Sequence, residues 1–127
     1  MSSKTPSGSE RRRSPRIPTD QKARLGGERT MPECQCINIS LGGIYCTLSA
    51  PVPLYTRMEV TLALPITDGE GLTRDIPVSF EGAVVRIDDP PEGEAGVRAA
   101  LVFQSMDDDT EWVIGKYLLQ NYRRWRE

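Results

Sequence analysis

Histidine is absent from the 127 residues, and with it the commonest general acid–base group and metal ligand of proteins. The sequence also lacks a serine-nucleophile motif, a Walker loop and a dinucleotide-binding glycine pattern. Carboxylates cluster at Asp88-Asp89 and Asp107-Asp108-Asp109, but these lie at an expected loop and helix start, where such charge is usually structural or solvated. The sequence therefore favours no enzymatic activity, and we expect neither a metal nor a cofactor.

Cysteine is scarce as well, with Cys34, Cys36 and Cys46 as the three in the chain. A disulfide between Cys34 and Cys36 would be strained, because a single residue separates them. Without histidine or a Cys-x-x-Cys pair, a tetrahedral zinc site is also disfavoured. We therefore expect three small, half-buried apolar side chains in a reducing compartment.

Long hydrophobic runs are missing too. No apolar stretch approaches the roughly 18 residues that cross a bilayer. Residues 1–10 lack the apolar core of a secretory signal. These absences predict a cytoplasmic protein without membrane insertion.

Charge is divided unevenly along the chain. Residues 1–30 carry eight basic and three acidic side chains, a net charge of +5, so the total of −2 leaves −7 on the remainder. A largely acidic body repels DNA and RNA, whereas a basic arm can capture a small anion. We therefore expect no nucleic-acid partner, and a small barrel that binds nucleic acid through the arm is the disfavoured alternative.

Short segments of alternating apolar residues predict about six strands, at residues 22–25, 31–39, 44–48, 57–64, 76–88 and 97–103. Polar loops are expected at residues 67–74 and 89–96. Ile37 and Ile39 are expected to share a face, and Gly82 predicts a bulge or bend. Gly42 and Gly43 predict a tight turn that uses positive φ. The hairpin order of these strands indicates a small antiparallel barrel.

The C-terminal segment predicts an amphipathic helix over about residues 108–125. Apolar and aromatic residues recur there at three- and four-residue spacing, at Ile114, Tyr117, Leu118, Asn121, Tyr122 and Trp125. Aspartates at its start and arginines at its end both suit the helix dipole. We expect the helix to cover one opening or side of the sheet. A membrane-surface helix is the alternative, disfavoured because its exposed middle carries little basic charge.

The whole chain thus predicts an all-β fold: a small six-stranded antiparallel β-barrel of split-barrel type, with a C-terminal α-helix and a flexible N-terminal arm. Residues 1–9 are expected to form a polar, disordered tail. Residues 10–18 are expected to form an arginine-rich arm, kept extended by Pro15 and Pro18. The barrel covers about residues 21–104.

Two sequence motifs stand out. Arg12 and Arg16 have the spacing R-x-x-x-R, and Asn38, Ser40 and Gly43 form N-x-S-x-x-G about two dozen residues later. Together and in this order they resemble the two-part signature of the PilZ domain family, over roughly residues 10–125. The resemblance implies a bacterial receptor for the second messenger cyclic di-GMP, with these five residues as its ligand-binding set. It also implies a protein partner downstream, which the sequence does not identify.

Physical chemistry supports these roles. Arginine pairs through its planar fork with phosphate oxygens and with guanine O6 and N7. Asn38 and Ser40, two residues apart, are expected to face the same way and to meet a guanine edge or a sugar hydroxyl. Gly43 is expected to let the backbone approach the ligand. Arg11 and Arg13 add positive charge, which raises the hypothesis of two stacked ligand molecules per chain.

Simpler roles exist for the same residues. Arg12 and Arg16 also fit a solvated tail, Asn38 and Ser40 fit a local turn, and Gly43 fits a positive φ alone. An adaptor of this family that binds proteins but not the nucleotide is the corresponding alternative function. Arg86 is also a candidate for the ligand surface, although a surface salt bridge is its more ordinary use.

Overall fold

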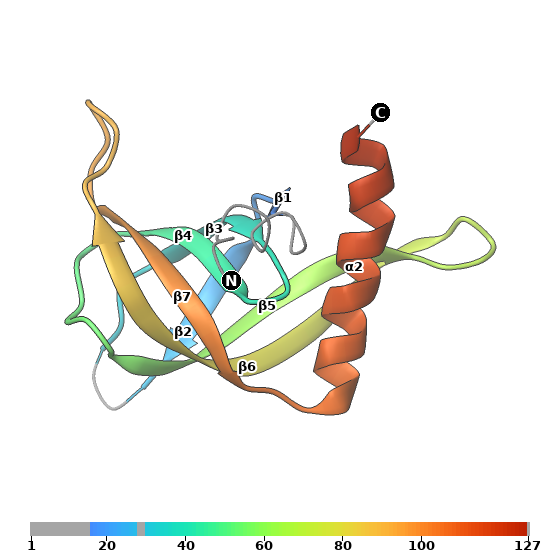
Figure 1. Ribbon diagram of the computed structural model, residues 1–127, viewed down its shortest axis with the longest axis horizontal. Coiled ribbons are helices and arrows are strands. Elements are labelled where there is room, and N and C mark those ends of the chain that lie inside the picture. Colours follow the sequence, from blue (N-terminus) through green and yellow to red (C-terminus); the bar gives the residue numbers. More distant parts are fainter. Residues whose placement is uncertain (1–15, 28–29, 127) are drawn as a thin grey trace, which may run out of the picture.

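The computed structural model describes residues 16–27 and 30–126, and one antiparallel sheet accounts for most of them (Figure 1). In chain order the elements are β1 (Ile17–Pro18), β2 (Lys22–Gly26), β3 (Cys34–Ile39), β4 (Gly43–Leu48), β5 (Arg57–Thr67), β6 (Thr73–Asp88), β7 (Val97–Ser105) and the helix α2 (Asp108–Arg126). The expected tail and residues 10–15 of the expected arm lie outside the described residues.

Six of the strands close into a barrel. Their order is β3-β2-β5-β6-β7-β4, and β4 pairs again with β3 to complete the ring. β1 lies outside this ring, because it pairs with the end of β3 that β2 leaves free. The predicted six-stranded antiparallel barrel with a C-terminal helix is confirmed. β1 is an additional strand that the sequence analysis placed within the arm.

Strands β5 and β6 extend further than expected and form a long hairpin that projects from the barrel (Figure 1). The expected loop at residues 67–74 was too long, since Thr67 pairs with Thr73 and Ile66 with Arg74. The actual turn is held by Asp68, whose Oδ1 accepts hydrogen bonds from the backbone N–H groups of Glu70 and Leu72. Such an aspartate turn closes the hairpin through local side-chain hydrogen bonds to the backbone, which the pattern of apolar alternation does not reveal.

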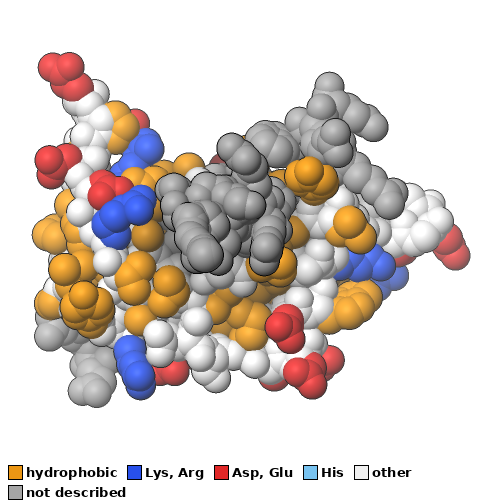
Figure 2. Space-filling view, viewed as in Figure 1, with side chains coloured by type: hydrophobic (Ala, Val, Ile, Leu, Met, Phe, Trp, Pro, Cys, Tyr) orange, Lys and Arg blue, Asp and Glu red, His pale blue; other side chains and the backbone are white. Residues whose placement is uncertain are grey.

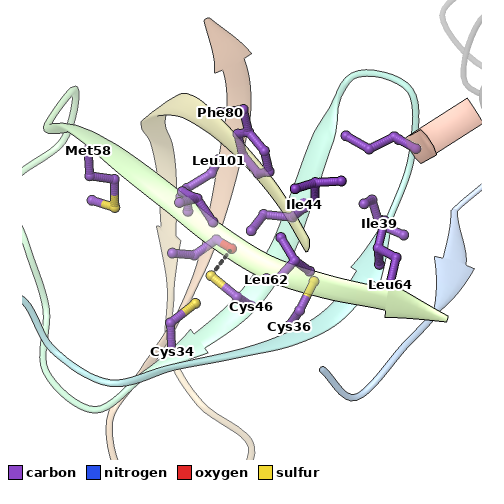
Figure 3. Packing of buried hydrophobic residues seen from close by; sticks show 14 of the residues in the cluster. Cys34, Cys36, Ile39, Ile44, Cys46, Met58, Leu62, Leu64, Phe80 and Leu101 are labelled. Atoms are coloured by element: carbon purple, nitrogen blue, oxygen red, sulfur yellow. Dashed lines mark hydrogen bonds between the residues drawn. The ribbon is translucent and has the colours of Figure 1, made fainter. Parts of the chain in front are cut away.

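The core follows the expected alternation on β4 and β5. Its buried apolar side chains include Ile44, Cys46, Leu48, Met58, Val60, Leu62, Leu64, Phe80 and Leu101 (Figure 3). On both strands, the residues between these point outward and are at most half-buried. Gly82 occupies a register shift between β6 and β7, which confirms the predicted bulge.

Strand β3 departs from simple alternation. Its register against β4 shifts between Cys36 and Asn38, so Ile37 is an extra residue. Cys36 and Ile39 are fully buried, whereas Ile37 is half-buried. The expectation that Ile37 and Ile39 share a face is wrong, because one inserted residue reverses the alternation. As a result, Asn38 points to the outer surface.

The three cysteines are free thiols, as predicted, and they are buried more completely than expected. Cys36 and Cys46 are directly opposed across β3 and β4, and Cys46 Sγ lies 3.7 Å from the carbonyl oxygen of Ala99 (Figure 3). Burial raises the pKa of Cys36 to about 12, which keeps it protonated at neutral pH. The cysteines therefore serve as small core side chains.

Helix α2 begins as predicted. The backbone N–H of Thr110 donates to Asp107 Oδ1 at 2.8 Å, so Asp107 is the N-cap. Ile114, Tyr117 and Leu118 are buried where the helix packs against β5, β6 and β1. Gln120 fixes the second half, since it bonds both backbone groups of Thr67. In the described part of the chain, no helix is apolar enough over sufficient length to cross a bilayer.

The turn between β3 and β4 forms without positive φ at Gly42 or Gly43, contrary to the prediction. Gly43 is required for a different reason. A Cβ atom there would overlap the carbonyl oxygen of Leu101 on β7, because β4 and β7 approach closely at this point. The same atom at Gly42 would come no nearer than 4.0 Å to another group, Ser40 Oγ.

We therefore expect Gly43→Ala to destabilise the fold by about 1–3 kcal/mol or more, since overpacking against backbone cannot be relieved by a side-chain rotation. Urea unfolding followed by circular dichroism measures this. Gly42→Ala is the matched control, with an unchanged or slightly raised midpoint. Equal midpoints for the two variants would contradict this account of Gly43.

Candidate ligand surface

The pairing of β1 with β3 brings together the two sequence motifs. Ile17 pairs with Ile39 in antiparallel register, so the preceding residue, Arg16, lies level with Ser40. Ile17 is buried while Arg16 is exposed, which places Arg16 on the outer face, as the alternation of a strand requires. One described arginine of the first motif therefore lies beside the second motif, more than twenty residues away in sequence.

A row of residues continues this outer face across five strands. Pro18 of β1 pairs with Asn38, Asn38 with Tyr45, Tyr45 with Ala100, and Ala100 with Arg86. The row runs through β3, β4 and β7 to β6. It forms a continuous wall that begins with Pro18 and carries the polar side chains of Asn38, Tyr45 and Arg86, with the small Ala100 between the last two. We call this wall, together with Arg16 and Ser40, the ligand surface.

Tyr45, Asp88 and Arg86 form a polar cluster on this surface. The hydroxyl of Tyr45 donates to Asp88 Oδ2 at 2.7 Å. Arg86 Nε donates to both oxygens of Asp88, at 3.1 and 3.2 Å, and its guanidinium carbon lies 5.6 Å from the centre of the Tyr45 ring. The hydrogen bond from Tyr45 and then the Arg86 bond lower the pKa of Asp88. The expected salt bridge of Arg86 is thus present, and it is built into the ligand surface.

Sequence reasoning missed Tyr45 and Asp88. The alternation already placed Tyr45 opposite the buried face of its strand, which was the one available signal. Its partner could not be found, because Asp88 lies 43 residues away and reaches Tyr45 only through the order β4-β7-β6.

Arg98 adds a further positive charge near this cluster. It pairs with Thr47 on β4 and with Asp88 on β6. Its Nη2 atom lies 3.3 Å from Glu94 Oε1, whereas Nε is buried and has no acceptor among the described residues. Arg16, Arg86 and Arg98 therefore place three guanidinium groups on the outer wall, and those of Arg86 and Arg98 are paired with carboxylates.

Ser40 is engaged within its own turn. Its Oγ accepts the N–H of Gly42 at 3.2 Å and lies 3.4 Å from the carbonyl oxygen of Gly43, while its backbone N–H donates to that same carbonyl. Gly43 is required by the close approach of β7, as described above. Two of the three residues in N-x-S-x-x-G thus have a structural role. The proposed ligand contacts of Arg11, Arg12 and Arg13 lie outside the described residues.

The chain is a small antiparallel barrel whose outer wall carries arginine, asparagine and tyrosine side chains. The family model of the PilZ domain matches residues 10–120, so the chain belongs to the PilZ domain family.

Among solved structures, the chain is similar to the Bacillus subtilis inhibitor of motility, MotI/DgrA, with a TM-score of 0.67 and 22% sequence identity. The similarity covers 91% of this chain and 51% of that one, so the chain spans about half the length of that protein. No curated protein matched the sequence. The structural similarity supports the fold.

We predict that Tyr45→Phe raises the pKa of Asp88 towards its ordinary value, because the Tyr45 hydroxyl is the largest cause of the lowering. Carboxyl carbon NMR titration measures the shift. A folded-state pKa that is lowered gives stability above the unfolded value and loses it as the pH falls. The stability difference between wild type and Tyr45→Phe should therefore shrink in acid.

The carboxyl of Asp107 supplies the control within the same titration. The backbone N–H of Thr110 lowers the pKa of Asp107, and this contact is independent of Tyr45. The pKa of Asp107 should be the same in both proteins. An unchanged pKa of Asp88 in Tyr45→Phe would contradict the role given to the hydroxyl.

Proposed function

We propose that the protein is a receptor for cyclic di-GMP, which binds on the ligand surface beneath the arginine arm and signals to a partner protein within the bacterial cell. The observation that carries this proposal is the register of β1 on β3. It aligns Arg16 with Ser40 and Asn38 on one outer face, although the two motifs are separate in sequence. Family membership is consistent with this function.

The chemistry of the surface suits a dianion with two guanines. Arg16 is exposed, and its guanidinium can pair with a phosphate or with guanine O6 and N7. Asn38 is half-buried on the outer wall and can donate to and accept from a base edge. Tyr45 lies next to Asn38, and its ring can stack on a base. The outer wall of a barrel is convex, so the arm with Arg12 has to supply the opposite side of the site.

Ligand binding can be relayed through β1. The strand contacts α2, and Ile17 is buried in the core next to it. An arm that closes over the ligand would pull on Arg16 and Pro18 and so act on the helix. A ligand shifts such an equilibrium only by its difference in affinity for the open and closed arm. Arg11 and Arg13 provide charge for a second stacked ligand molecule.

A second candidate function is a PilZ-domain adaptor that binds proteins without the nucleotide. The hydrogen bonds of Ser40 and the steric requirement at Gly43 favour it, because both residues are needed by the fold itself. The fold would then require Ser40 and Gly43 of the motif even in a protein that does not bind the nucleotide. The structural neighbour is described as an inhibitor of motility.

Calorimetric titration with cyclic di-GMP separates these functions. We expect the wild type to bind, and Arg16→Ala to bind roughly 10- to 100-fold more weakly, the usual effect of losing one charge-assisted hydrogen bond. Arg12→Ala/Arg16→Ala should abolish measurable binding. The same titration gives the stoichiometry and so tests for two molecules per chain.

Arg24→Ala is the matched control, because Arg24 is an exposed arginine on β2, away from the ligand surface. Its affinity should equal that of the wild type. Equal losses in Arg24→Ala and Arg16→Ala would indicate general electrostatic attraction. No heat from folded wild-type protein would favour the adaptor.

A further inference from the structure

The outward side of α2 carries an unusual apolar stripe. Trp112 and Leu119 are 62% and 59% exposed, although both are large hydrophobic residues. With Gly115 and Lys116 between them, they line one shallow hollow on the helix. Figure 2 shows hydrophobic and basic side chains side by side over the region that α2 occupies in Figure 1. The stripe is separate from the ligand surface, which lies on strands β1, β3, β4, β7 and β6.

No contact among the described residues requires a glycine at position 115, in the middle of this stripe. Glycine in a helix interior costs about 1 kcal/mol relative to alanine. A Cβ atom added at Gly115 would meet nothing within 4 Å, so the fold does not need a small residue there. A gap between two exposed hydrophobic side chains instead suits the close approach of another helix.

The charges on α2 indicate which helix that is. Its first turn is acidic, with Asp108, Asp109 and Glu111. Its last turn contains three arginines in the sequence, Arg123, Arg124 and Arg126. Two such helices packed antiparallel place the acidic end of each beside the basic end of the other, and their dipoles are opposed. Parallel packing would bring like charges together.

The key residues of α2 are spaced symmetrically along the helix, as a twofold axis between two antiparallel copies requires. Trp112 and Leu119 lie at equal distances from the midpoint between Gly115 and Lys116, and so do positions 108 and 123. In an antiparallel pair centred there, Trp112 of one helix meets Leu119 of the other, and Asp108 meets position 123. The ammonium of Lys116 lies 4.9 Å from the centre of its own Trp112 ring, one turn back, which draws it away from the axis.

We propose that this stripe is a self-association surface, on which α2 of a second copy of the chain packs antiparallel about Gly115. An isologous contact of this kind needs complementarity of one patch with itself, and the stripe has it. One pair of helices forms a small interface, so the dimer should dissociate on dilution. An anionic membrane fits less well, because the acidic first turn would face the lipid headgroups.

Charge exchange tests the arrangement directly. In a dimer of Asp108→Arg, the new arginine of each helix faces the arginine at position 123 of the other, and in a dimer of Arg123→Asp two aspartates face each other. Each variant alone should therefore dimerise at least tenfold more weakly than the wild type, as measured by sedimentation velocity. In an equimolar mixture both contacts are restored, and a heterodimer should form with nearly the wild-type affinity. A mixture that stays monomeric, or a wild type that is monomeric at every concentration, would overturn the proposal.

Gly115→Gln gives an independent test with effects of opposite sign. The fold accepts the side chain and the helix gains propensity, so the unfolding temperature of the monomer should rise. Dimerisation should be lost, because the gap is filled. Leu54→Gln, which changes another exposed leucine on the loop between β4 and β5, should dimerise like the wild type. Undiminished dimerisation of Gly115→Gln would refute the antiparallel contact.

Discussion

The pairing of β3 with three other strands is the constraint on which the rest of the structure depends. One edge of β3 is fully used by β4, and the opposite edge is shared between β2 and β1. The pairing of β3 with β4 closes the barrel, and the pairing of β3 with β1 holds the first described strand against it. The bulge at Ile37 keeps both Cys36 and Ile39 in the core. A continuous strand could not bury these two residues and still expose Asn38.

This constraint explains why the N-x-S-x-x-G motif serves both fold and surface. Ser40 closes the turn between β3 and β4 through its own hydrogen bonds, and Gly43 allows β7 to approach. Asn38 differs, because its half-buried side chain lies on the outer wall beside Tyr45. The motif thus sets the shape of the wall, while Arg16, Arg86 and Arg98 provide its guanidinium groups.

Much of the fold could be predicted from the sequence, because local rules governed it. Alternation on β4 and β5, the Asp107 cap and the bulge at Gly82 each depend on neighbours in sequence. The face of Ile37 was predicted wrongly, because a bulge without glycine leaves no local signal. Positive φ at Gly43 was also wrong, since the reason for that glycine is the carbonyl of Leu101, 58 positions further along the chain.

The sequence by itself determined the class of fold, the two motifs and the separation of a basic arm from an acidic body. These follow from residue type and periodicity, which act over a few residues. Only the tertiary structure decided that Arg16 lies beside Ser40, that Tyr45 meets Asp88 and Arg86, and that the glycine of α2 faces away from the fold. Each of these depends on strand order or packing, which join residues far apart in the chain and leave no periodic trace in it.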